Sequence, residues 1–108
     1  MALTQTQIDE LNDRLVETFK DIYDPEIPVD IYELGLIYDA IIDENGKVKV
    51  VMTLTTPNCP VAESMPVEVE ERVREVEGVT DVEVKLTFDP PWDRDMMSEE
   101  AKFELGFI

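Results

Sequence analysis

The dipeptide Asn45-Gly46 constrains the fold of this 108-residue chain more than any other feature. It separates two runs rich in β-forming residues, 34–43 and 47–55. An Asn-Gly pair in that setting is the strongest short-range signal for a β-hairpin. If these two residues form the whole turn, Ile41 faces Val50 across the hairpin. The sequence therefore predicts a hairpin with this register.

An amphipathic helix is predicted before the hairpin, over residues 4–22. Its apolar residues recur at spacings of three and four: Ile8, Leu11, Leu15, Phe19 and Ile22. Thr4 followed by Gln7 has the spacing of a capping box. Asp24 is expected to end the helix, because the residue before a proline, here Pro25, is pushed out of the helical region.

A second helix is predicted after the hairpin, within 60–77, with Gly78 as its left-handed cap. Its start is open between two alternatives. A helix that begins at Pro60 would be kinked at Pro66, which lacks a backbone donor. A helix with Ser64 as its N-cap would hold Pro66 in its first turn, where proline is tolerated.

A third strand is predicted over 79–88, because apolar and polar residues alternate there as in a strand buried on one face. Ser98 is expected to cap a short last helix that ends at Leu105-Gly106. The order helix, strand, strand, helix, strand, helix predicts a single two-layer α+β domain over 1–108. We expect a small mixed sheet with helices packed on one face.

Charge and composition exclude several classes of function. The chain carries 26 acidic and 9 basic residues, a net charge of −17, with one cysteine and no histidine. Such a polyanion repels nucleic-acid phosphates and anionic membrane lipids. One cysteine without histidine rules out an internal disulfide, Cys/His zinc sites within one chain, and Cys-His or Ser-His dyads. No run reaches the length of a membrane span or signal core, so a soluble cytoplasmic protein is expected.

Cys59, in the segment TTPNCP, is the residue with the most chemistry to offer. A free cysteine is most often a small buried hydrophobe. A thiol in a turn before a helix instead gains thiolate character from the unpaired N–H groups, and Thr56 and Asn58 would support it. A phosphatase loop would need arginine where Met65 stands, and a cysteine hydrolase needs a histidine base. Contact with a soft metal or a sulfur species is the chemistry that remains.

Two proline-stiffened loops are the other candidate regions. The first holds Asp24, Glu26, Asp30 and Glu33, interleaved with prolines that include Pro25. Most acidic runs form a solvated face, but prolines that fix the backbone also suit recognition or the approach of a metal. The second holds Pro90, Pro91 and Trp92. Trp92 either covers the edge of the core or forms a docking surface for a partner.

Four segments, in this order, resemble the SufT/PaaD-like family of iron–sulfur cluster assembly proteins: DPEIPVDIYELGLIYD, VKVVMTLTTPNCP, GVTDVEVKLTFDPPW and MSEEAKFELG. The resemblance implies a fold similar to the C-terminal domain of NifU-type proteins and a non-catalytic role in maturing 4Fe–4S proteins. It places the family's motif cysteine at Cys59. It places the acidic and PPW motifs at these residues: Asp24, Pro25, Glu26, Pro90, Pro91 and Trp92.

The predicted function is that of an accessory factor in iron–sulfur cluster assembly or delivery, with Cys59 as the metal or sulfur contact. The expected partners are iron–sulfur assembly proteins and apo iron–sulfur targets. A pure adaptor with a structural cysteine is the main rival, and an independent thiol peroxidase is a third alternative. Because a cluster normally takes four protein ligands, we expect no tightly bound cofactor. At most a transient cluster would be shared, either across a homodimer or with a partner.

Overall fold

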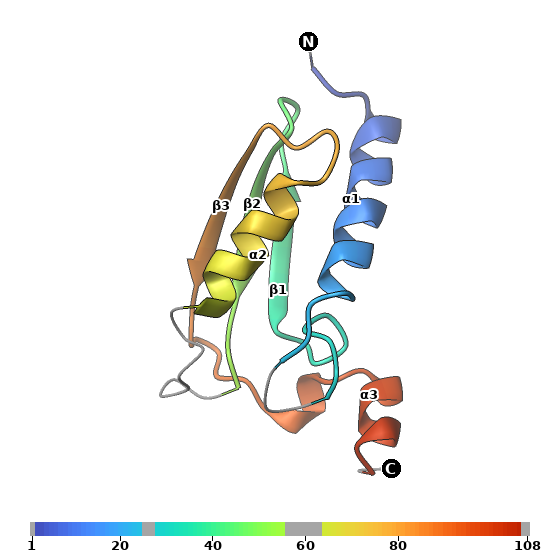
Figure 1. Cartoon of the computed structure of the whole chain (residues 1–108), viewed down its shortest axis with the longest axis vertical. Coiled ribbons are helices and arrows are strands. Elements are labelled where there is room, and N and C mark those ends of the chain that lie inside the picture. Colours follow the sequence, from blue (N-terminus) through green and yellow to red (C-terminus); the bar gives the residue numbers. More distant parts are fainter. Residues whose placement is uncertain (1, 25–27, 56–63, 107–108) are drawn as a thin grey trace.

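The computed structural model describes residues 2–24, 28–55 and 64–106. Its elements follow the predicted order, with one 3₁₀ turn (η2) added before the last helix (Figure 1). They are α1 (Gln5–Phe19), β1 (Ile37–Ile42), β2 (Lys47–Met52), α2 (Ser64–Arg74), β3 (Asp81–Leu86), η2 (Arg94–Met96) and α3 (Glu99–Glu104).

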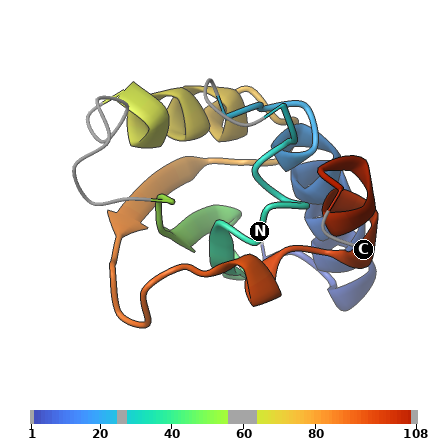
Figure 2. The ribbon, with the colours of Figure 1, turned by 90° about the horizontal axis from the view of Figure 1, so that it is seen from below.

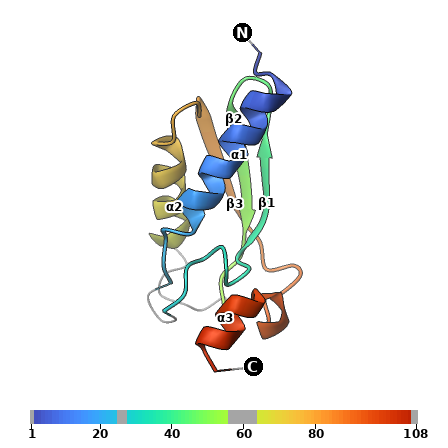
Figure 3. The ribbon, with the colours of Figure 1, turned by 90° about the vertical axis from the view of Figure 1, so that its right-hand side faces the viewer.

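The three strands form one mixed sheet in the order β1-β2-β3. β1 and β2 are antiparallel, whereas β2 and β3 are parallel and are connected through α2. Helices α1 and α2 lie on one side of this sheet, as Figures 2 and 3 show. Helix α3 lies beyond the end of the sheet where β1 begins (Figure 1). The predicted α+β architecture is confirmed.

The hairpin is present, but its turn is longer than predicted. The Asp43 N–H donates to the Lys47 carbonyl oxygen at 3.0 Å, which closes a three-residue loop rather than a two-residue turn. The Asp43 carboxylate accepts the N–H groups of Asn45 and Lys47 at 2.8 and 2.9 Å and holds this loop in place. Gly46 completes the loop in the left-handed region, with φ at 85°.

The longer loop shifts the register, so the predicted pairing of Ile41 with Val50 is wrong. Ala40 pairs with Val50 instead, and Ile41 pairs with Lys49. Since the side-chain period of a strand is two, this one-residue shift moves Ile41 to the other face of the sheet. Ile41 is 49% exposed there.

The capping box of α1 is confirmed, but the helix ends earlier than expected. Thr4 Oγ1 accepts the Gln7 N–H at 3.1 Å, and Gln7 Oε1 accepts the Thr4 N–H at 2.8 Å. The last helical residue is Phe19, several residues before the proline that was expected to stop it. After Phe19 the helical bonds give way to tighter turns, in which the Asp21 N–H donates to the Thr18 carbonyl at 3.1 Å and the Ile22 N–H to the Phe19 carbonyl at 3.2 Å. The Ile22 carbonyl then accepts the Ile31 N–H at 2.8 Å.

The local signals around the other helices agree with the structure. Pro66 lies in the first turn of α2 as the structure describes it, while residues 60–63 lie outside the described residues. Gly78 has a φ of 101°, as its predicted left-handed conformation requires. Ser98 Oγ caps α3 by accepting the Ala101 N–H at 3.1 Å.

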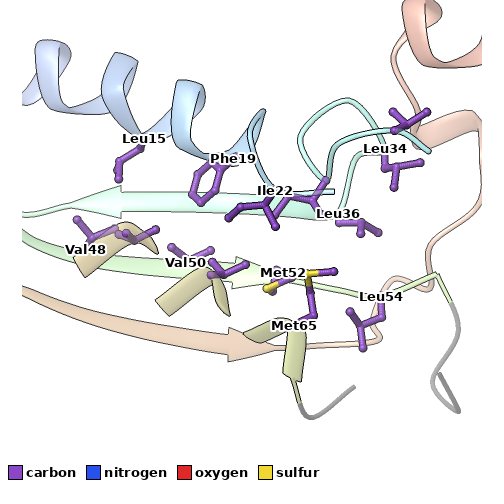
Figure 4. Packing of buried hydrophobic residues seen from close by; sticks show 14 of the residues in the cluster. Leu15, Phe19, Ile22, Leu34, Leu36, Val48, Val50, Met52, Leu54 and Met65 are labelled. Carbon is purple, nitrogen blue, oxygen red and sulfur yellow. The ribbon is translucent and has the colours of Figure 1, made fainter. Parts of the chain in front are cut away.

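A hydrophobic core lies between the sheet and helices α1 and α2 (Figure 4). Phe19 of α1, Val69 of α2 and Val50 of the central strand all belong to this cluster and are at most 1% exposed. The labelled side chains of Figure 4 are all at most 4% exposed: Leu15, Phe19, Ile22, Leu34, Leu36, Val48, Val50, Met52, Leu54 and Met65. Burial on this scale, at roughly 25 cal/mol per Å² of apolar surface, is the main stabilising contribution to the fold.

Candidate functional site

The structure describes part of the predicted site. The residues that it describes are Asp24, Asp30, Glu33, Pro90, Pro91 and Trp92. Those that lie outside the described residues are Pro25, Glu26, Thr56, Asn58 and Cys59. The reactivity of the Cys59 thiol therefore stays a prediction, and the geometry below concerns the two loops.

Trp92 fastens the PPW segment to the loop that precedes β1. Its indole Nε1 donates a hydrogen bond to the Leu34 carbonyl oxygen at 2.7 Å. The indole is partly buried and packs against the hydrophobic core, and Leu34 is fully buried. The hydrogen bond thus satisfies a carbonyl that water does not reach. Two motifs that are far apart in the sequence are joined at this point.

Tyr38 provides a second attachment for the same segment. Its hydroxyl donates to the Pro90 carbonyl oxygen at 2.8 Å and lies 3.5 Å from the sulfur of Met96. Pro90 and Pro91 themselves are exposed. The two prolines are therefore presented to solvent on a segment held by the side chains of Tyr38 and Trp92.

Gly35 allows the close approach of these two segments, and the sequence analysis did not single it out. It has a φ of 80°, and a Cβ at this position would overlap the Met96 carbonyl oxygen. Only glycine fits both conditions. The signal that could have found it is a glycine between Leu34 and Leu36, just before a strand.

Asp30 and Glu33 form a turn with defined hydrogen bonds. Asp30 Oδ2 accepts the Glu33 N–H at 2.9 Å, and the Glu33 carbonyl accepts the Ser98 N–H at 2.8 Å. Burial raises the pKa of Asp30, and the hydrogen bond from the Glu33 N–H opposes that rise. The Glu33 carboxylate lies 3.6 Å from Lys20 Nζ, which also sits 5.4 Å from the centre of the Tyr32 ring.

Asp24 is the most buried of the acids that the structure describes in this loop. Only 4% of it is exposed, whereas Asp30 and Glu33 are partly buried. Its N–H donates to the Val29 carbonyl at 3.4 Å, and Tyr23 forms an isolated bridge with Asp30. The acidic loop therefore folds back on itself. A buried carboxylate is costly unless it is hydrogen-bonded or paired, so a purely solvated face does not describe Asp24.

An acidic cavity of about 160 Å³ lies between this loop and α3. Its lining consists of Tyr23, Val29, Asp30, Glu33, Glu100, Ala101 and Glu104. Within the described part of the chain, no group of three or more acidic, cysteine or histidine side chains is arranged to hold a metal ion.

Thr53 lies where β2 leads towards the segment that carries Cys59. It is fully buried, and its N–H donates to the Leu36 carbonyl at 2.9 Å. Its hydroxyl oxygen has no hydrogen-bond partner among the described residues. An unpaired buried polar group costs about 1–3 kcal/mol, so the Thr53 hydroxyl lowers the free energy of unfolding.

Comparison with known proteins adds to this geometry. A family model described as "Iron-sulfur cluster assembly protein" matches residues 12–86. An "Fe-S protein maturation auxiliary factor" of Porphyromonas gingivalis is 51% identical over 94 residues, which cover 87% of this chain and 90% of the relative. The "Fe-S protein maturation auxiliary factor YitW" of Bacillus subtilis is 41% identical over 96 residues, 89% of this chain and 94% of that protein.

The fold has solved counterparts as well. A domain of unknown function from Bacillus anthracis superposes with a TM-score of 0.85 at 35% sequence identity. The superposition covers 93% of this chain and 95% of that structure. None of the helices described here is long and apolar enough to cross a bilayer.

Proposed function

This chain belongs to the iron–sulfur cluster assembly protein family, and on that premise we propose that it is a cytoplasmic accessory factor which matures or delivers clusters to 4Fe–4S target proteins. Its family membership confirms the resemblance found in the sequence. The observation that carries the proposal is the nearly full-length similarity to proteins named Fe-S protein maturation auxiliary factors. The expected partners are other iron–sulfur assembly proteins and apo target proteins.

The proposed role is non-catalytic, with Cys59 as the contact for iron or sulfur. The whole sequence holds one cysteine and no histidine, whereas a cluster normally takes four protein ligands, usually thiolates. A monomer of this chain therefore supplies one thiolate ligand. Any cluster it carries would be transient and completed by thiols from a partner, from a second copy or from a small molecule.

The proposed recognition surface consists of the acidic loop and the PPW segment. The hydrogen bonds of Trp92 to Leu34 and of Tyr38 to Pro90 support this, because they hold the two segments in a fixed relation. The same observation supports the second candidate function, an adaptor that bridges assembly proteins and targets while Cys59 is structural. The two functions differ in what they require of the thiol.

The decisive experiment measures the cluster occupancy of a candidate 4Fe–4S target protein in cells that lack this protein. Restoring the wild-type chain should raise occupancy, and restoring Cys59→Ser should not. Full rescue by a stably folded Cys59→Ser variant would favour the adaptor. Equal occupancy with and without the protein would refute both functions.

Reconstitution of the purified protein tests how a cluster is held. After anaerobic incubation with iron and sulfide, absorption spectroscopy and sizing should show no stoichiometric cluster on the desalted monomer. A monomer that keeps one cluster would contradict the ligand argument. A cluster that persists in Cys59→Ser would contradict it as well, since the chain has no other thiol or imidazole.

A further inference from the structure

Strand β3 forms an edge of the sheet, because the strand order is β1-β2-β3 (Figure 1). Helix α2 packs over one face of β3, and β2 pairs with one of its two sides. Its other side is paired with no strand that the structure describes. An exposed strand edge presents a row of backbone N–H and carbonyl groups that can pair with another chain. We call this side of β3 (Asp81–Leu86) the open edge.

The hydrogen bonds of β3 show which residues present their backbone groups at the open edge. The Thr87 N–H donates to the Met52 carbonyl at 2.8 Å, so from Asp81 onwards the odd-numbered residues turn their backbone groups towards β2. Backbone groups alternate in direction along a strand, so the even-numbered residues Val82, Val84 and Leu86 point to the open edge. The Val82 N–H donates to Asp81 Oδ1 at 2.9 Å, which agrees with an N–H that faces no described strand.

The side chains of β3 alternate between apolar and charged residues. Val82, Val84 and Leu86 face the helices, and the last two are only partly buried against the core. Glu83 and Lys85 are exposed on the opposite face of the sheet. Neither of these two side chains forms an ion pair or hydrogen bond with a described residue. The open edge thus carries an acid and a base, both unpaired within the described chain, beside apolar groups that are partly covered.

The sequence of β3 is complementary to itself when two copies of the strand pair in antiparallel. A two-fold axis at Val84 places Glu83 of each copy opposite Lys85 of the other. The same axis places Val82 opposite Leu86, so the residues that face the open edge are the ones that exchange hydrogen bonds. Opposite charges that face each other stabilise an antiparallel pair, and like charges destabilise it. Moving the axis by one residue would set Glu83 against Glu83 or Lys85 against Lys85.

We propose that β3 pairs with β3 of a second copy of this chain across the axis at Val84, which joins two three-stranded sheets into one continuous sheet. The pair between Glu83 and Lys85 then forms on each side of the axis, and the apolar residues of both strands cover one another on the helix side. The hydrogen bond of Val82 to Asp81 is exchanged for one between the chains. This inference does not depend on the proposed role in cluster maturation.

Helix α2 adds an apolar contact near the same axis. Arg74 lies 3.6 Å from Asp81 at the start of β3, so the side of α2 that carries Arg74 borders the open edge. Val67 lies on this side too, because it is about two helical turns before Arg74. Helix α2 runs against β3 (Figure 1), and two turns span about 10 Å, as do the three residues from Asp81 to Val84. Val67, which is 50% exposed, is therefore placed about level with the axis, where it would cover Val67 of the second copy.

The contact is small, so the association is expected to be weak. Six residues of strand span about 20 Å, and this edge with the flank of one short helix buries less than the roughly 800 Å² per partner of a stable interface. The net charge of −17 also makes two copies repel each other. At about 0.15 M salt, charges more than about 8 Å apart are largely screened, whereas facing residues on paired strands are closer than that. Dimers should form at protein concentrations on the order of 0.1–1 mM.

The test is analytical ultracentrifugation of the purified chain at protein concentrations from about 0.01 to 1 mM. The wild type should show an equilibrium between monomer and dimer. Glu83→Lys and Lys85→Glu each turn both facing pairs into like charges and should weaken dimerisation about tenfold or more. The control variant Lys102→Glu changes the net charge as Lys85→Glu does, but on α3, and should dimerise within about twofold of wild type.

Exchanging the two charges makes the test specific to this register. The double variant Glu83→Lys/Lys85→Glu keeps the net charge and restores both facing pairs, so its dimerisation should return to within about threefold of wild type. The two single variants should form a heterodimer when they are mixed, because one contributes two bases and the other two acids at the facing positions. Both positions are exposed, so the variants should keep the fold, which circular dichroism checks.

Amide hydrogen exchange tests the same pairing without any variant. The N–H groups of Val84 and Leu86 point to the open edge and should exchange more slowly as the concentration of the wild type rises. Concentration-dependent protection elsewhere, with Val84 unchanged, would assign the dimer to another surface and overturn the proposal.

Three other results would overturn it. They are a wild type that stays monomeric at about 1 mM, equal weakening in the control variant, and a mixture of the two single variants that associates no better than each alone. None of these measurements involves iron or sulfide, so their failure is distinguishable from a failure of the proposed function.

Discussion

Replacing Trp92 with alanine is expected to lower the free energy of unfolding by about 3–4 kcal/mol. Truncating a buried aromatic side chain costs about 3–5 kcal/mol, and the partial exposure of this indole places it towards the lower end. The estimate includes the hydrogen bond from Nε1 to the Leu34 carbonyl, which contributes about 1 kcal/mol. A docking residue without a packing role would cost far less in stability.

Two further variants separate packing from hydrogen bonding. Trp92→Phe keeps an aromatic ring but removes the donor, so the buried Leu34 carbonyl loses this partner. We expect a loss of about 1–2 kcal/mol for it. Phe103→Ala is the control for removing a large aromatic side chain, because Phe103 is 71% exposed. Its cost should stay within about 0.5 kcal/mol.

The assay is urea unfolding followed by far-ultraviolet circular dichroism. Fluorescence is unsuitable because Trp92 is the only tryptophan and is absent from the variants. With an unchanged slope against urea, the shift in midpoint gives the change in stability. A loss below about 1 kcal/mol in Trp92→Ala would refute the packing argument and favour a docking role. A Trp92→Phe variant as stable as wild type would refute the contribution of the hydrogen bond.

Three other perturbations follow from the structure. Thr53→Val should raise the free energy of unfolding by about 1 kcal/mol, because it removes a buried hydroxyl without a partner among the described residues. No gain in urea unfolding would count against that explanation. Gly35→Ala should cost at least about 2 kcal/mol because its methyl group meets the Met96 carbonyl, whereas Gly106→Ala, at the same φ of 80° but in open space, should cost about 1 kcal/mol. Equal costs would contradict the steric argument. Burial raises the pKa of Asp30 above 3.8, so its protonated form favours folding, and the wild type should lose stability relative to Asp30→Asn as pH rises through that raised value. Parallel stability profiles of the two proteins between about pH 3 and 6 would refute this.

Much of the fold could be predicted because its signals are local. The capping box at Thr4, the cap at Ser98 and the left-handed Gly78 depend on residues within a turn or two of one another. Two predictions failed for different reasons. Beyond Phe19 the chain takes up tight turns, and Ile22 accepts the Ile31 N–H, nine residues away, which no local pattern indicated. The hairpin register was misjudged within a local window, because the Asp43 carboxylate holds a three-residue loop by accepting the N–H groups of Asn45 and Lys47.

The candidate site divides in the same way. The prolines and acidic residues of the sequence indicated the PPW segment and the acidic loop, and the resemblance matched both to motifs of the family. That the indole of Trp92 reaches Leu34, or that Gly35 must be a glycine to pass Met96, depends on segments that meet only in the folded chain. No local pattern carries that information, because Trp92 and Leu34 are 58 residues apart in the sequence and all three strands lie between them along the chain.

The sequence by itself determined which chemical groups this protein can use. One thiol, no imidazole and a net charge of −17 limit its ligands and partners whatever the fold. Only the tertiary structure decided which charged side chains form ion pairs. Lys20 lies beside Glu33 and is paired, whereas Lys47 and Lys49 are held on the central strand with no partner within the described residues. The physical reason is that composition counts charges, while their pairing depends on distances that long-range packing sets.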